Sequence, residues 1–157
     1  MPDKTYVAGD RIYAADANLY LTHTGGAWNS YTPAFVGLTV GNGALTGKWY
    51  RSGRLITFKV RLAFGTSTTI TAAVSASLPT AYADGTEVES FSGLMFDSSV
   101  NLRFQAMTFA LTTTTFGIRA LALSGGHLAQ VDLSATVPFT WATGDALTVS
   151  GTYEAAS

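Results

Sequence analysis

The sequence predicts an all-β fold: an antiparallel β-sandwich, of jelly-roll type, with a short N-terminal helix or arm. From Trp28 onward, Thr, Val, Phe and Tyr dominate, and turn signals recur at the short, regular spacing of all-β domains. Several segments between these turns alternate apolar and polar side chains, which is the period of a strand with one buried face. About eight or nine short antiparallel strands without intervening helices fit a sandwich, with a jelly roll as the expected topology.

The N-terminal region differs from this pattern. Apolar side chains such as Ile12 and Leu19 fall near helical spacing, which predicts a short helix over residues 10–21. Such a helix is too short to be stable alone, so it must pack on another element. We therefore divide the chain into an N-terminal arm with a short helix (1–27) and a β-sandwich domain (28–157).

Turn signals then separate the strands of the domain. Asn42-Gly43 is the preferred pair for a tight hairpin turn, and Ser52-Gly53, Gly125-Gly126 and Thr143-Gly144-Asp145 mark further turns. The strands between the turns are expected near residues 33–40, 45–51, 54–64, 69–78, 90–96, 100–111, 115–123, 129–141 and 145–154.

Alternation assigns the two faces of several strands. In the strand at 54–64, Ile56, Phe58, Val60 and Leu62 form the expected core face, and Leu55, Thr57, Lys59 and Arg61 form a mostly wet face. The strand at 100–111 is less polarised, because its second face carries Met107, Phe109 and Leu111 beside Arg103 and Gln105.

Apolar side chains on both faces of a strand have two interpretations. The residues concerned are Phe109, Leu111, Ile118, Leu121 and Leu123. The plain interpretation is that they fill the core, and the alternative is that an outer face packs on another subunit. A monomeric sandwich usually has polar outer faces, so this many apolar side chains on an outer face would indicate a subunit contact.

The composition excludes several classes of protein. Charged residues make up 12% of the 157 residues and the net charge is −1, against a usual charged share of about 25%. A disordered chain, a nucleic-acid-binding protein and a membrane-surface module would each need more charge. So little charge protects an isolated monomer poorly against association, so we expect much of the surface to face other subunits.

Cysteine, an export signal and a membrane segment are all missing from the sequence. The chain has no Cys, which removes disulfides, zinc-thiolate sites and thiol catalysis. The segment at 1–5 lacks the apolar core of a signal peptide, and no apolar run is long enough for a membrane helix. We expect synthesis in a cytoplasm, no cleaved export signal and no membrane insertion.

Catalytic and cofactor motifs fail when their spacing is checked. Residues 41–48 imitate a phosphate loop, but the required first glycine falls on Asn42 and the magnesium-binding hydroxyl on Trp49. A Ser-His-Asp arrangement would have to use His127 with Asp132 or Asp97, and nothing else in the sequence supports it.

The acidic residues and His23 likewise show no spacing typical of a catalytic or metal-binding site. Glu87 and Glu89 are the one close carboxylate pair and are expected in a solvated loop. The segment at 97–101 lacks the glycine and the distal Glu of a calcium loop, so it is expected to be a turn. We predict no enzymatic activity, no cofactor and no metal.

The aromatic residues leave a binding function open. The residues concerned are Trp28, Tyr31, Trp49, Tyr50 and Trp141, together with Tyr153 near the end of the sequence. They suit a sheet core or a subunit interface, and the alternative is a surface on which sugar rings stack.

Four short blocks, in this order, resemble tailed-bacteriophage virion proteins. The first is a motif typical of tail-fibre and minor-tail modules: Gly, an acidic residue, two or three further residues, then Ala-Ala-Asp-x-Asn. It is matched by Gly9, Asp10, Ala14, Ala15, Asp16 and Asn18. The others are Trp28-x-x-Tyr31-Thr32-Pro33, Tyr50-x-x-Gly53-Arg54, and a block from Pro138 to Leu147 that leads into Gly151-x-Tyr153-Glu154. The chain lacks the shaft or repeats of a long tail fibre.

The resemblance implies a non-enzymatic virion structural protein made in the host cytoplasm. It implies a homotrimer, bound to other virion proteins through the N-terminal attachment arm, in a tail-associated fibre or receptor-binding module. A host surface glycan is a partner left open, and no nucleic acid is expected. A capsid decoration protein that stabilises the phage head is the alternative, and a carbohydrate-binding β-sandwich module is a further one.

Overall fold

The computed structural model describes residues 28–83 and 89–156. The predicted helix over 10–21 and the whole attachment motif lie outside these residues. The described part forms strands β1 (Asn29–Tyr31), β2 (Phe35–Thr39), β3 (Ala44–Ser52), β4 (Leu55–Ala63), β5 (Thr69–Ser77), β6 (Ser90–Asp97), β7 (Leu102–Ala110), β8 (Thr115–Ser124), β9 (His127–Asp132) and β10 (Ala146–Glu154).

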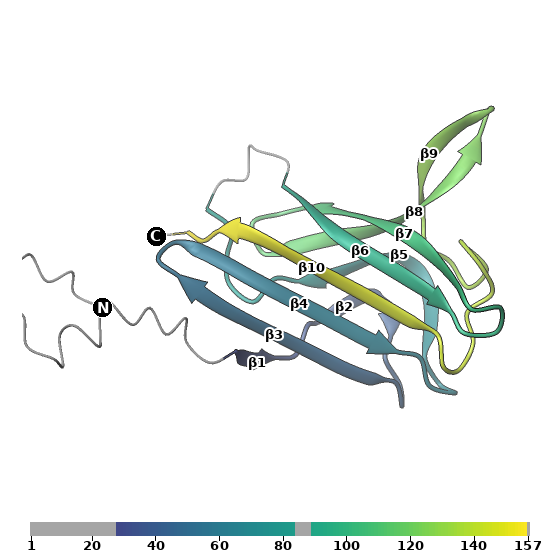
Figure 1. Ribbon diagram of the computed structural model, residues 1–157, viewed down its shortest axis with the longest axis horizontal. Helices are drawn as coiled ribbons and strands as arrows, with labels where there is room; N and C mark the ends of the chain where they lie inside the picture. Colours follow the sequence, from purple (N-terminus) through teal and green to yellow (C-terminus); the bar gives the residue numbers. More distant parts are fainter. Residues whose placement is uncertain (1–27, 84–88, 157) are drawn as a thin grey trace, which may run out of the picture.

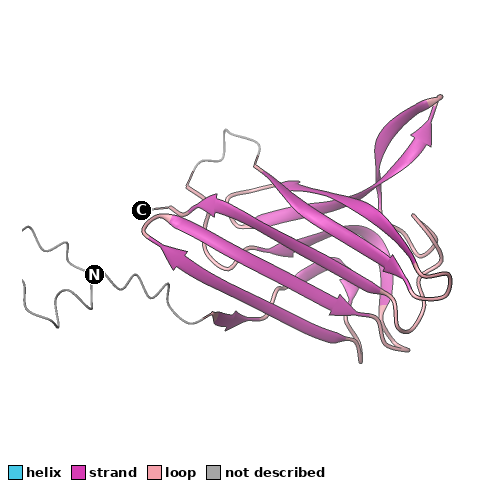
Figure 2. Ribbon diagram, in the orientation of Figure 1, coloured by secondary structure: helices cyan, strands magenta, loops and turns pink. Residues whose placement is uncertain are grey.

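All ten strands belong to one antiparallel sheet, which confirms the predicted all-β class (Figure 2). The strand order is β1-β3-β4-β10-β6-β7-β8-β5-β2, and β9 pairs with β8 beside this path. The sheet curls into a half-barrel, with β3, β4 and β10 on one side and β2 and β5 on the other (Figure 1). A jelly-roll sandwich is not confirmed, because the strands are joined in one continuous sheet.

The core lies inside the curl, where the alternation placed it. The predicted inner residues Ile56, Phe58 and Leu62 are fully buried. The Phe58 ring has its centroid 5.1 Å from that of Phe91, 5.5 Å from that of Phe116 and 5.8 Å from that of Tyr153. These four rings come from β4, β6, β8 and β10, so one aromatic cluster links four strands of the curled sheet.

Two local predictions need correction. The turn at Asn42 exists, but it is not a hairpin turn, because β2 pairs with β5 and β3 pairs with β1 and β4. The Asn42 side chain instead accepts hydrogen bonds from the backbone and hydroxyl of Ser67. The strand expected over 129–141 ends at Asp132, because β5 occupies the same edge of β8 from Ile118 onward; Ser134 and Val137 then bond each other in a turn.

Strand β1 was not predicted, and it brings an unpaired hydroxyl into the interior. The Tyr31 hydroxyl is buried and has no hydrogen-bond partner among the described residues. Burial, with a smaller contribution from Tyr153, raises the pKa of Tyr31 above its ordinary value of 10.0. The neutral form of the Tyr31 hydroxyl is therefore favoured, and its burial is not compensated by a hydrogen bond from a described residue.

We therefore expect Tyr31→Phe to stabilise the protein by about 1 kcal/mol at neutral pH, because it removes an unpaired buried polar group. The raised pKa means that the folded state holds the proton more tightly, so stability is lost as pH rises above 10. The variant should lose less stability in that range. Urea unfolding at neutral and alkaline pH measures both effects, and a loss of stability at neutral pH would contradict the assignment.

Candidate functional site

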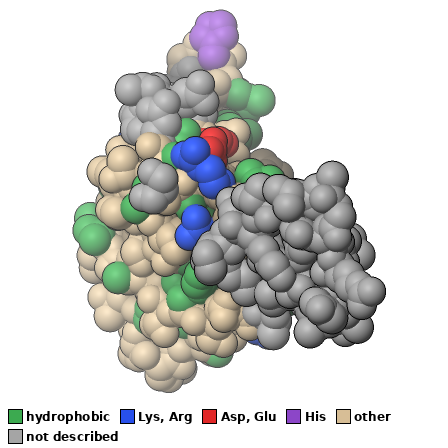
Figure 3. Space-filling view, turned by 90° about the vertical axis from the view of Figure 1, so that its left-hand side faces the viewer, with side chains coloured by type: hydrophobic (Ala, Val, Ile, Leu, Met, Phe, Trp, Pro, Cys, Tyr) green, Lys and Arg blue, Asp and Glu red, His purple; other side chains and the backbone are tan. Residues whose placement is uncertain are grey.

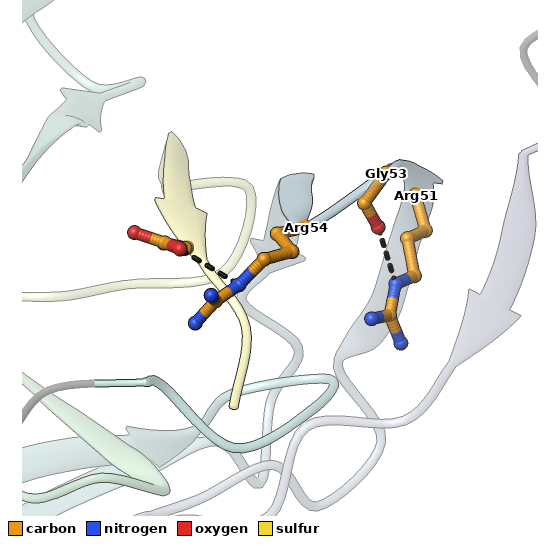
Figure 4. A network of polar contacts seen from close by, with 4 residues as sticks. Arg51, Gly53 and Arg54 are labelled. Carbon is orange, nitrogen blue, oxygen red and sulfur yellow. Dashed lines mark hydrogen bonds and ion pairs between the residues drawn. The ribbon is translucent and has the colours of Figure 1, made fainter. Parts of the chain in front are cut away.

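Charged side chains are sparse on the described surface and several are already paired. At the β3–β4 turn, Arg54 Nε lies 2.7 Å from Glu154 Oε1, and Arg51 Nε donates to the carbonyl oxygen of Gly53 at 2.7 Å (Figure 4). Figure 3 looks onto this end of the molecule, where basic side chains gather around an acidic one and most of the visible described surface is uncharged. Any site must therefore be sought among apolar residues or unpaired cations.

The most conspicuous feature is the hairpin of β8 and β9, which leaves the body of the molecule (Figure 1). Strand β8 pairs with β5 up to Ile118 and with β7 up to Ala120, and beyond that point only with β9. A free two-stranded hairpin is only marginally stable in water. The outer half of this hairpin therefore lacks the packing that a sheet normally provides.

The projecting hairpin is apolar and exposed. Leu123 is 77% exposed, Leu128 is 72% exposed and Leu121 is 38% exposed. From residue 120 to residue 131 there is no Lys, Arg, Asp, Glu or Pro. These residue types are the ones that natural edge strands use to prevent association. The edge of β9 away from β8 has no strand partner in the described sheet, so it also offers free backbone groups.

The apolar surface continues from the hairpin onto the body. A Cβ on Gly117 would lie 3.1 Å from Leu111 Cγ and 3.3 Å from Phe109 Cζ, so both side chains cover the outer face of β8. The ion pair between Arg119 and Asp132, 3.0 Å long, marks the base of the hairpin. Of the five residues with two interpretations, only Ile118 is in the core; Phe109, Leu111, Leu121 and Leu123 lie outside it.

The predicted aromatic residues do not form one surface. Tyr31 and Trp49 are partly buried against the core. The Trp141 ring stacks on Phe64 at 4.4 Å, and its Nε1 donates to the Val137 carbonyl oxygen.

Trp28 and Tyr50 alone meet on the outside. They pack edge to face with centroids 5.0 Å apart, and Lys59 Nζ lies 4.6 Å from the centre of the Trp28 ring. Tyr153, also considered for sugar stacking, is buried in the core.

The enzyme-like candidates are dispersed. His127 and Asp132 occupy opposite ends of β9, roughly 16 Å apart along the strand. Asp97 is buried at the end of β6, where it accepts hydrogen bonds from the backbone and hydroxyl of Ser99 in the turn that was expected here. Glu89 precedes β6, while Glu87 and His23 lie outside the described residues.

Within the described ranges, no three His, Asp or Glu side chains gather as metal ligands. The same residues contain no helix with the length and hydropathy needed to cross a bilayer. Comparisons with protein-family models, with curated proteins and with solved structures found no match to this chain. The function must therefore be argued from the geometry of the surface.

Sequence reasoning did not single out Leu128 or the hairpin as a unit. The signal was present as an uncharged run on both sides of Gly125-Gly126. It also did not single out the cations Lys48 and Arg61, which lie near Lys59 on the outer face of the sheet.

Proposed function

We propose that this chain is a non-enzymatic structural protein of a phage virion, tail-associated, which assembles as a homotrimer through its β8–β9 hairpin. The single observation that supports the proposal most is the projecting hairpin, whose residues 120–131 carry no charge and expose Leu123 and Leu128. A jelly-roll topology is not needed for this role, because a curled sheet also presents an outer face for subunit contact.

A second copy of the chain is the occupant that fits the hairpin best. Each buried Leu side chain is worth about 1.5–3 kcal/mol, so covering several of them repays association. The free edge of β9 allows a strand of another copy to add to it. The choice of three copies comes from the resemblance to phage virion proteins; the surface itself supports only association of copies, without a number.

The setting in a virion is tested by the composition of purified particles. Particles produced by the genome that encodes the chain should contain it, and it should co-purify through a density gradient. A copy number in the tens or fewer supports the tail position, whereas hundreds of copies would identify a capsid decoration protein and contradict the tail assignment. Absence of the chain from the particles would contradict the virion role altogether.

A further inference from the structure

A second surface, several strands away from the hairpin, carries three cations on the outer face of β3 and β4. Lys48 on β3 is the direct register partner of Lys59 on β4, and Arg61 follows two residues later on the same face. All three side chains are exposed. Strands β10, β6 and β7 lie between β4 and the hairpin strand β8 in the sheet order.

The three cations have no acidic partner among the described residues. The two ion pairs in the described part use Arg54 with Glu154 and Arg119 with Asp132. Like charges directly opposite each other on neighbouring strands destabilise a sheet. The facing pair Lys48 and Lys59 therefore costs stability in the free protein, and an anionic ligand that lies between them would offset this cost.

The same face is hollowed where the cations lie. A depression of about 320 Å³ is lined by Thr46, Lys48, Lys59, Val60, Arg61 and Thr148. The lining combines ammonium and guanidinium groups with the hydroxyls of Thr46 and Thr148. Such a set can pair with acidic groups and can also exchange hydrogen bonds with sugar hydroxyls.

An aromatic pair borders the depression through Lys59. The Lys59 ammonium lies 4.6 Å from the centre of the Trp28 ring, and Trp28, which is 41% exposed, packs edge to face on Tyr50. A small inorganic anion would contact only the cations and would make no use of the Trp28 ring. An apolar ring surface beside them favours a ligand with both a flat, partly apolar body and acidic groups.

We propose that the outer face of β3, β4 and β10 binds an acidic saccharide, with its acidic groups on Lys48, Lys59 and Arg61 and a sugar ring near Trp28. A nucleic acid fits less well, because a chain whose net charge is −1 lacks the basic surplus that is usual in nucleic-acid-binding proteins. The inference does not rest on the proposed virion function, since it concerns a different surface and a different ligand.

Calorimetric titration of the full chain with oligogalacturonate, which carries a carboxylate on each ring, tests this inference. We expect binding that weakens as salt is raised, and no binding of a neutral malto-oligosaccharide of the same length. The inference would be overturned if neither oligogalacturonate nor a sulfated oligosaccharide bound. It would also be overturned if the neutral sugar bound equally well. Tighter binding of a single-stranded oligonucleotide would overturn it in favour of a nucleic acid.

Variants locate the site. Lys48→Ala, Arg61→Ala and Trp28→Ala should each weaken binding roughly tenfold. The matched control is Arg103→Ala, because the Arg103 guanidinium also lies over an aromatic ring, 4.8 Å from the centre of Phe96, but stands on β7. Lys48→Ala should leave the melting temperature unchanged or higher. Equal weakening by the Arg103 variant would contradict the assigned position.

Discussion

Asp145→Ala is expected to lower the free energy of unfolding by about 3 kcal/mol, which for a domain of this size lowers Tm by roughly 10 °C. The Asp145 side chain is fully buried. Its Oδ1 accepts bonds from the backbone and hydroxyl of Ser98, both at 2.9 Å, and its Oδ2 accepts from the Ala142 N–H at 2.6 Å. One carboxylate thus ties the β6–β7 turn to the loop before β10.

The Asp145→Asn variant sharpens this prediction. Its amide has one acceptor oxygen in place of two, so an NH₂ group must face either Ser98 or Ala142, whose N–H groups are donors. We expect at least half of the loss seen with alanine, despite the similar shape. Glu154→Ala is the control, because its exposed ion pair with Arg54 should contribute less than about 1 kcal/mol. Thermal and urea unfolding measure these differences, and an Asn variant as stable as the native protein would contradict the assigned bonds.

Leu123→Asp combined with Leu128→Asp is expected to dissociate the assembly into monomers. Each Leu removed from an interface forfeits about 1.5–3 kcal/mol, and the charge that replaces it would have to be buried. Two such changes in each interface raise the dissociation constant by at least about a hundredfold. Both side chains lie beyond the last pairing of β8 with β7, so the core should be unaffected. Size-exclusion chromatography with light scattering measures the change in mass.

The matched control for the hairpin variant is Val100→Asp. Val100 is also apolar and 58% exposed, but it lies in the turn between β6 and β7. It should leave the mass of the assembly unchanged. Dissociation by the Val100 variant, or an intact assembly in the doubly substituted hairpin, would show that another surface joins the subunits.

The positions of most strands could be predicted because local signals specify them. Alternation in 54–64 and the Ser52-Gly53 turn place β4 and its inner face correctly. The three-residue β1 could not be predicted, because only its pairing with β3 makes it a strand. The strand order was also beyond reach, because alternation identifies the buried face of a strand and not its neighbours.

The candidate sites were predictable only in part. Applying the two-residue period to β8 would have separated Ile118, which faces the core, from Leu121 and Leu123, which do not. Whether such outward side chains are covered depends on where the neighbouring strands end, and the sequence does not encode this locally. The facing pair Lys48 and Lys59 follows from the tight β3–β4 turn, once that register is accepted.

The mass of the unmodified protein in solution decides whether copies of the chain join through the β8–β9 hairpin and the adjoining outer face of β8. Sedimentation equilibrium at micromolar concentration should give three times the 16.5 kDa of one chain. Because no other described residues cover the hairpin, we expect no stable monomer under these conditions. A single species of 16.5 kDa at that concentration would contradict it.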